Sequence, residues 1–197
     1  MMNTERSLYE IEVALAKSDS FNFIRNIVAF NVNGWGSKFH IGHECDMLVL
    51  SKSGYLTEIE IKRSFSDFIA DFKKKHHHES AGIIKYFYYC VPEKIYDKVC
   101  SELSKRDVLY SGIITFNEDL IIRHHGYDKN VHIREMRPYR KLSPEEQLQV
   151  ARFGAMRSVI LKEKLIKEKE EIPDPRFGKV KTYPENVLKQ VFDMPIN

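Results

Sequence analysis

The chain has 197 residues, of which 43% are hydrophobic and 30% charged, an ordinary balance for one soluble domain with a core and a modest appendage. Its apolar runs are too short to cross a bilayer and no signal-like segment begins it, so we expect a cytoplasmic protein with no membrane partner. The net charge of +3 is weak support for a nucleic-acid partner, and the three widely spaced cysteines (Cys45, Cys90 and Cys100) argue against a disulfide framework or a structural zinc site.

The first 62 residues follow the pattern helix, strand, strand, strand. Helical spacing of Leu8, Ile11 and Leu15 predicts a helix over residues 5–17. Runs rich in β-branched and aromatic residues, separated by glycine-containing turns, then predict three strands. These strands are expected at residues 22–31, 44–51 and 56–62.

The helix after the third strand is the clearest element of the sequence. Phe65, Phe68, Ile69 and Phe72 fall at i, i+3, i+4 and i+7, which forms one apolar stripe, and Ser64 suits the N-cap position. The pattern that follows predicts a buried strand, a helix and two short strands, at residues 84–91, 93–105, 111–116 and 119–123.

The C-terminal part of the sequence is predicted to be helical. Ser143-Pro144-Glu145-Glu146 is a capping box with proline at the first helical position, which predicts a long helix through about Glu170. We therefore expect an α/β domain over residues 1–140, with a mixed central sheet flanked by helices. Residues 141–197 would add a C-terminal helical extension and a loosely packed tail.

Three polar side chains stand out in the second and third predicted strands. Asp46 lies in an otherwise apolar strand, and strand alternation places Glu60 and Lys62 on one face of the next strand. Glu60 and Lys62 alone would indicate only an exposed ion pair. A hairpin that joins the two strands would bring Asp46 near Glu60, and partly buried carboxylates need a cation or dense hydrogen bonding. The pattern therefore predicts a Mg²⁺ or Mn²⁺ site with a lysine beside it, suited to phosphodiester hydrolysis.

This stretch resembles a known family motif. The residues HECDMLVLSKSGYLTEIEIKRSFSDFIADFKKKH are similar to the D…ExK motif of PD-(D/E)XK nucleases, and the α-β-β-β-α-β order resembles their restriction-endonuclease-like core. More narrowly, EIEIKRSFSDFIADFKK followed by KYFYYCVP resembles the MmcB-like branch of DNA-repair endonucleases. The resemblance covers roughly residues 5–115.

The resemblance implies roles for individual residues. Asp46 and Glu60 would be ligands of Mg²⁺ or Mn²⁺, the carbonyl of Ile61 would join them, and Lys62 would be the catalytic lysine. Members of this superfamily often present a further glutamate from the first helix, and Glu12 fits because it lies on the inward face. The sequence departs from the family pattern at Cys45, which stands where the motif has proline.

Neighbouring polar residues have less specific interpretations. Glu58 shares the face of Glu60 and is expected to pair with a lysine rather than add a metal ligand. His43 and Glu44 are expected at a solvated strand end, although either could reach a metal through water. Lys74 and Lys75 are candidates for phosphate contacts.

Trp35 is a candidate for stacking on a base. A loop-packing aromatic at Trp35 and a solvated helix end at Lys74 and Lys75 are the alternatives.

The leading functional hypothesis is a metal-dependent nuclease that cleaves DNA. One alternative is a catalytically inactive nucleic-acid-binding or assembly module that keeps the nuclease fold. Another is that the helix over residues 143–170 serves as an interaction arm or as the seam of a homodimer.

Overall fold

The computed structural model describes residues 6–33, 41, 43–73, 82–106, 108, 111–125 and 138–171. Contacts divide the chain into two compact units, Met1–Ala155 and Met156–Asn197. The sheet and all the described motif residues belong to the first unit. None of the described helices combines the length and apolar character that a bilayer crossing requires.

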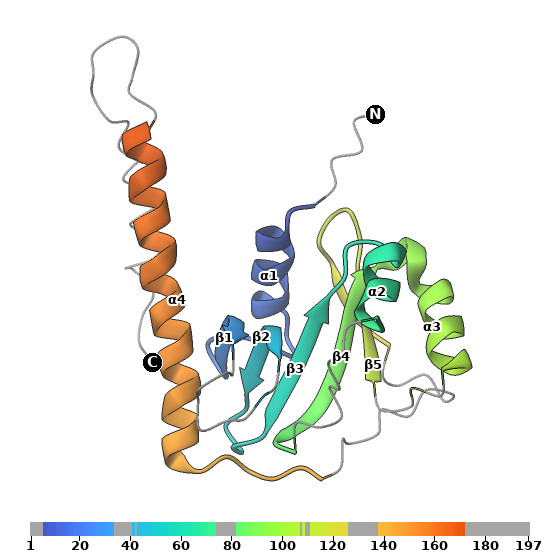
Figure 1. The fold of residues 1–197 in the computed structure, drawn as a ribbon, viewed down its shortest axis with the longest axis horizontal. Coiled ribbons are helices and arrows are strands. Elements are labelled where there is room, and N and C mark those ends of the chain that lie inside the picture. The colour runs from blue at the N-terminus through green and yellow to red at the C-terminus, as the bar shows by residue number, and fades with distance from the viewer. Residues whose placement is uncertain are drawn as a thin grey trace. The chain divides into compact units, whose positions relative to one another are not determined.

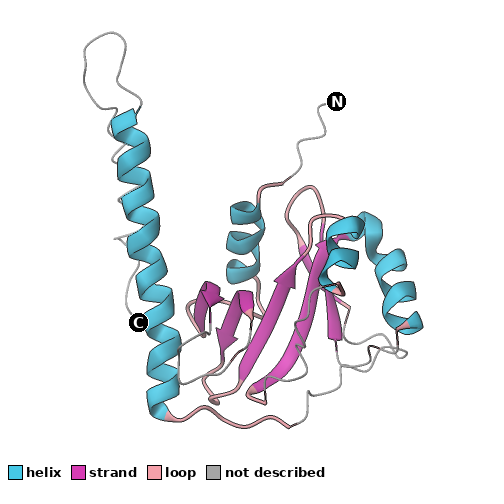
Figure 2. Cartoon of the chain, viewed as in Figure 1, coloured by secondary structure: helices cyan, strands magenta, loops and turns pink. Residues whose placement is uncertain are grey.

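The first unit is built on a mixed sheet (Figures 1 and 2), six-stranded within the described residues and ordered β1-β2-β3-β4-β5-β6. The β3/β4 and β4/β5 pairs are parallel, and the other three pairs are antiparallel. The strands are β1 (Ile27–Asn33), β2 (Glu44–Leu50), β3 (Leu56–Ile61), β4 (Ile84–Pro92), β5 (Ser111–Phe116) and β6 (Ile122–His124). This is the α/β fold class expected from the sequence.

Helices cover both faces of this sheet. On one face, α1 (Leu8–Lys17) buries apolar side chains against β2 and β3. On the other, α2 (Phe65–Asp71) and α3 (Tyr96–Lys105) contact each other, and Figure 1 shows them as a neighbouring pair. We call these the α1 face and the α2–α3 face. A short 3₁₀ helix (Glu93–Ile95) leads into α3.

The long helix α4 (Pro144–Glu171) begins within the first unit. Its side chains Val150 and Phe153 join the core of the α2–α3 face. Ser143 and Glu146 form the predicted capping box, because each backbone N–H is accepted by the side chain of the other residue. The predicted N-cap at Ser64 is also confirmed, since its hydroxyl accepts the N–H of Asp67.

The starts of two predicted strands were wrong, and asparagine is the reason in both cases. The first strand begins at Ile27 rather than at residue 22, because Asn22 accepts N–H groups from the next few residues and closes a turn. The last strand begins at Ile122, because the Asn117 side chain accepts the N–H groups of Asp119 and Ile121. At both places, hydrogen bonds to an asparagine form a turn where the start of a strand was predicted.

The alternation of side chains breaks at facing positions of β1 and β2. Val28 and Phe30 pack on the α1 face, yet Val32, two residues further on, packs on the α2–α3 face. Likewise Met47 belongs to the α1 face and Cys45 to the other. Regular strands keep residues i and i+2 on one face, so each strand changes face between these pairs.

The residue at the centre of the break in β1 is Asn31. It has a φ of 50°, a left-handed conformation that asparagine tolerates better than most residues. The register pairs Phe30 with Met47 and Val32 with Cys45, which leaves Asn31 opposite Asp46. The first motif aspartate therefore lies at an irregular point of the sheet.

Gly154 marks a close approach between α4 and β1. A Cβ atom there would lie 3.0 Å from the carbonyl oxygen of Val28. We expect Gly154→Val to destabilise the protein by about 1–3 kcal/mol, because the added atoms force the helix away from the strand. Urea unfolding measures this, with Ala155→Val, at an exposed position of the same helix, as the matched control. Equal stability of the two variants would contradict the close contact.

Candidate metal centre

Asp46 and Glu60 meet where β2 and β3 stop pairing. The backbone pairing of these strands runs from Leu50↔Leu56 to Met47↔Ile59. At the next position the Asp46 carboxylate accepts the N–H of Ile61 at 2.8 Å, and the Glu60 carboxylate accepts the N–H of Asp46 at 3.4 Å. Two carboxylates thus take the place of backbone acceptors and are held together at this point.

The backbone of Ile61 is directed toward the same place. Its N–H points at Asp46, and in an extended strand the carbonyl of a residue lies on the same side as its N–H. The next residue points the other way, since the Lys62 N–H donates to the carbonyl of Cys90 at 2.9 Å. The Ile61 carbonyl is therefore on the Asp46 side, as a third oxygen ligand would need to be.

Lys62 is held by two carboxylates. Its ammonium donates to Glu60 at 2.7 Å and to Asp71, on α2, at 2.9 Å, and the lysine is 3% exposed. The Tyr89 hydroxyl donates to the other oxygen of Asp71 at 3.1 Å. Burial by itself would lower the pKa of Lys62, but Glu60 and Asp71 raise it above its ordinary value. The amine is therefore a charged donor, fixed in direction by Glu60 on β3 and Asp71 on α2.

Glu12 turns inward from α1, as its helical position predicted, and is 5% exposed. Its carboxylate accepts a hydrogen bond of 3.0 Å from the side-chain amide of Asn31. Since Asn31 lies opposite Asp46 in the β1/β2 register, this bond connects α1 to the irregular point of the sheet.

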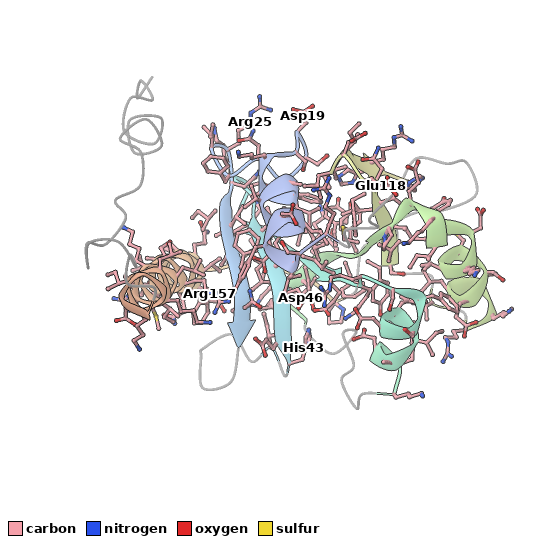
Figure 3. The ribbon with its side chains drawn as sticks, turned by 90° about the horizontal axis from the view of Figure 1, so that it is seen from above. Asp19, Arg25, His43, Asp46, Glu118 and Arg157 are labelled. Atoms are coloured by element: carbon pink, nitrogen blue, oxygen red, sulfur yellow. The ribbon has the colours of Figure 1, made fainter. Side chains whose placement is uncertain are left out.

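A second cluster of polar side chains lies beside the first. The His43 Nε2 atom is 2.6 Å from a Glu58 oxygen, and both side chains are buried. The Cys45 thiol belongs to the same group, in which the candidate ligand atoms of all three residues lie within 4.8 Å of one another. Figure 3 labels His43 and Asp46, which lie at the beginning of β2.

Among the residues that the structure describes here, acidic side chains are more numerous than basic ones. Within the described ranges, the buried lysine Lys62 lies near four buried carboxyl groups and one half-buried one. The buried groups are Glu12, Glu58, Glu60 and Asp71, and the half-buried one is Asp46. Burial raises the pKa of Glu60 to about 7, Asp46 and Glu58 add to the rise, and Lys62 opposes it. Burial, followed by the Glu58 and Glu60 carboxylates, raises the pKa of the Cys45 thiol well above its ordinary value. Buried carboxylates in such excess require a cation or a bound proton.

The predicted site residues are only partly described. Asp46, Glu60, Ile61 and Lys62 come together, and Glu12 is connected to them through Asn31. The DNA-contacting candidates Trp35, Lys74 and Lys75 lie outside the described residues.

One interpretation from the sequence was wrong, and two other residues have partners that the sequence did not predict. His43 is not at a solvated strand end, because its side chain is 3% exposed and contacts Glu58. The hydrogen bond that the structure describes for Glu58 joins it to that histidine, whereas a lysine was expected. Asp71 is a buried partner of Lys62 that the sequence did not predict.

Neither family models nor curated proteins match this chain. A solved structure of a protein of unknown function from Silicibacter pomeroyi aligns with 83% of this chain and 92% of that one, at 15% sequence identity and a TM-score of 0.49. This likeness carries no argument about the chain, and the resemblance to PD-(D/E)XK nucleases stays a prediction.

The raised pKa of Glu60 predicts how stability depends on pH without divalent ions. Between its ordinary value of 4.5 and about 7, the folded protein keeps a proton that the unfolded chain releases. Stability should therefore fall as pH rises through this window, by on the order of 3 kcal/mol from this group. Glu60→Gln keeps an acceptor for the Asp46 N–H but cannot lose a proton, so its stability should fall less. Thermal unfolding from pH 5 to 8 in chelator tests this, and equal pH slopes would contradict it.

Proposed function

We propose that the chain is a Mg²⁺- or Mn²⁺-dependent nuclease that hydrolyses phosphodiester bonds of DNA. The observation that supports it is the meeting of Asp46 and Glu60 at the end of the β2/β3 pairing, with the Lys62 ammonium 2.7 Å from Glu60. This arrangement agrees with the D…ExK motif to which the sequence is similar. A role in DNA repair or phage-related DNA processing, in the cytoplasm, is part of the same proposal.

The donor set fits a hard divalent cation. Asp46, Glu60 and the Ile61 carbonyl offer oxygen atoms only, which is the ligand type that Mg²⁺ and Mn²⁺ prefer. Burial raises the pKa of Glu60, and the Asp46 carboxylate raises it further, so a cation bound between the two would offset a cost that both groups carry. When bound, such an ion supplies Lewis-acid stabilisation of negative charge on the scissile phosphate.

The chain's own residues would divide the remaining tasks. Lys62 carries a fixed positive charge and donates hydrogen bonds, so it orients the attacking water and offsets charge that develops on the phosphate oxygens. Asp71 and Tyr89 act as positioning residues, because Asp71 on α2 accepts from the ammonium and the Tyr89 hydroxyl on β4 holds Asp71. Glu12 on α1 would assist by accepting a hydrogen bond from the Asn31 side chain, which holds Asn31 in place at the strand break.

Loss of the Lys62 charge should abolish most of the activity. We expect Lys62→Gln to lower the rate of Mn²⁺-dependent DNA cleavage by at least about 100-fold, because the variant cannot stabilise charge on the phosphate. Lys105→Gln removes one charge from an exposed position of α3 and should cleave like the wild type. Cleavage of supercoiled plasmid measures both. Equal cleavage by Lys62→Gln and the wild type would exclude the proposed enzyme.

Asp46→Asn is the variant that best preserves the structure. The amide oxygen of the new side chain can still accept the Ile61 N–H, so the protein should fold and melt as a single transition. Cleavage should nevertheless fall as far as in Lys62→Gln, because one metal ligand has lost its charge. If DNA binds without cleavage and without measurable metal affinity in the wild type, the inactive binding module is favoured instead.

A further inference from the structure

The second cluster brings three different donor atoms to one buried place. The side chains of His43, Cys45 and Glu58 are 3%, 0% and 0% exposed, and they offer nitrogen, sulfur and oxygen within 4.8 Å of one another. Glu58 lies on the α2–α3 face, since its register partners Leu48 and Phe87 belong to that core. The cluster is therefore enclosed between the sheet and the elements that cover this face.

The donor chemistry of the cluster differs from that of the Asp46 site. Mg²⁺ prefers oxygen ligands, whereas thiolate and imidazole select borderline cations such as Zn²⁺. Three protein ligands of mixed type, with a fourth position for water or another group, are the usual arrangement of a zinc site that is not purely structural. His43, Cys45 and Glu58 supply such a set.

The distances allow the cluster to close around an ion. The His43 Nε2 atom and the nearer Glu58 oxygen are 2.6 Å apart. Two such atoms that share a tetrahedral Zn²⁺ at its usual bond lengths are about 3.3 Å apart, so a shift of less than about 1 Å replaces the hydrogen bond by two metal bonds. Side-chain rotation alone can provide this movement.

Cys45 reaches the cluster because the side-chain alternation of β2 is broken between Cys45 and Met47. In a regular strand, Cys45 would share the face of Met47, which packs against α1. The break at Asn31 and Asp46 turns it to the opposite face, toward Glu58. A residue with positive φ in a strand is a strained feature that is retained at functional sites. The same irregularity thus builds the Asp46 site and the neighbouring cluster.

We propose that His43, Cys45 and Glu58 form a second metal site that binds a borderline divalent cation of the Zn²⁺ class. The competing interpretation is a hydrogen-bonded histidine–glutamate pair with a structural cysteine. The proposal does not rest on nuclease activity, because it concerns different donor atoms from those of Asp46 and Glu60.

Cobalt titration tests the site directly, because Co²⁺ replaces Zn²⁺ and absorbs in the near ultraviolet when a thiolate binds it. Full-length protein is first stripped with chelator and then titrated with Co²⁺. We expect a thiolate-to-cobalt band that saturates at one equivalent and disappears when Zn²⁺ is added. The band should be lost in Cys45→Ser and lost or shifted in His43→Gln.

Two control variants separate this site from other thiols and from the proposed active site. Cys100→Ser removes a half-buried thiol on α3 and should leave the band unchanged. Asp46→Asn should abolish cleavage and also leave the band unchanged. A wild-type protein without the band at saturating Co²⁺, or a band that persists in folded Cys45→Ser, overturns the proposal. The wild-type titration decides the matter even if a variant fails to fold.

Discussion

Buried negative charge at the end of the β2/β3 pairing is the constraint on which the rest of the site depends. Asp46 and Glu60 accept backbone N–H groups across the two strands, and these bonds fix both carboxylates in one place. The ammonium of Lys62 is shared between Glu60 and Asp71. Burial of several carboxylates around one lysine is unfavourable unless protons or a cation balance them. Burial is the main cause of the raised pKa of Glu60, and the neighbouring Asp46 carboxylate adds to it.

The strand break connects this charge to the architecture. Asn31 and Asp46 lie opposite each other where both strands change face. Next to this point, backbone N–H groups of β2 and β3 donate to carboxylate side chains instead of to backbone carbonyls. Glu12 reaches the break from α1, and Cys45 is turned toward Glu58 by it. One local irregularity therefore organises polar groups on both faces of an otherwise apolar sheet.

The sequence predicted the regular parts well. Apolar periodicity and capping residues gave the order of helices and strands, the inward direction of Glu12, and the approach of Asp46 to Glu60. The sequence-based prediction was wrong where side-chain hydrogen bonds disrupted the repeating pattern. Asn22 and Asn117 accept nearby backbone N–H groups, and turns form where strands were expected to begin. Period-two alternation also has no means of predicting the change of face at Asn31.

The change of face explains why the partners of Glu58 were missed. With regular alternation, Cys45 would lie on the α1 face, away from Glu58, and His43 was expected at a solvated strand end. Asp71 was missed for a different reason. Its partner Lys62 lies nine residues away on another element, and only the packing of α2 on the sheet brings the two together. Contacts of this kind depend on tertiary structure and are not encoded in the spacing of either residue.

The central claim is that Asp46 and Glu60 converge on a common cation, and a Mn²⁺-soaked crystal tests it most directly. We predict an anomalous difference peak at coordination distance from both carboxylates, on the side of the Ile61 carbonyl, that vanishes in Asp46→Asn. A map with no peak between these two side chains, or with one confined to His43, Cys45 and Glu58, would contradict the account.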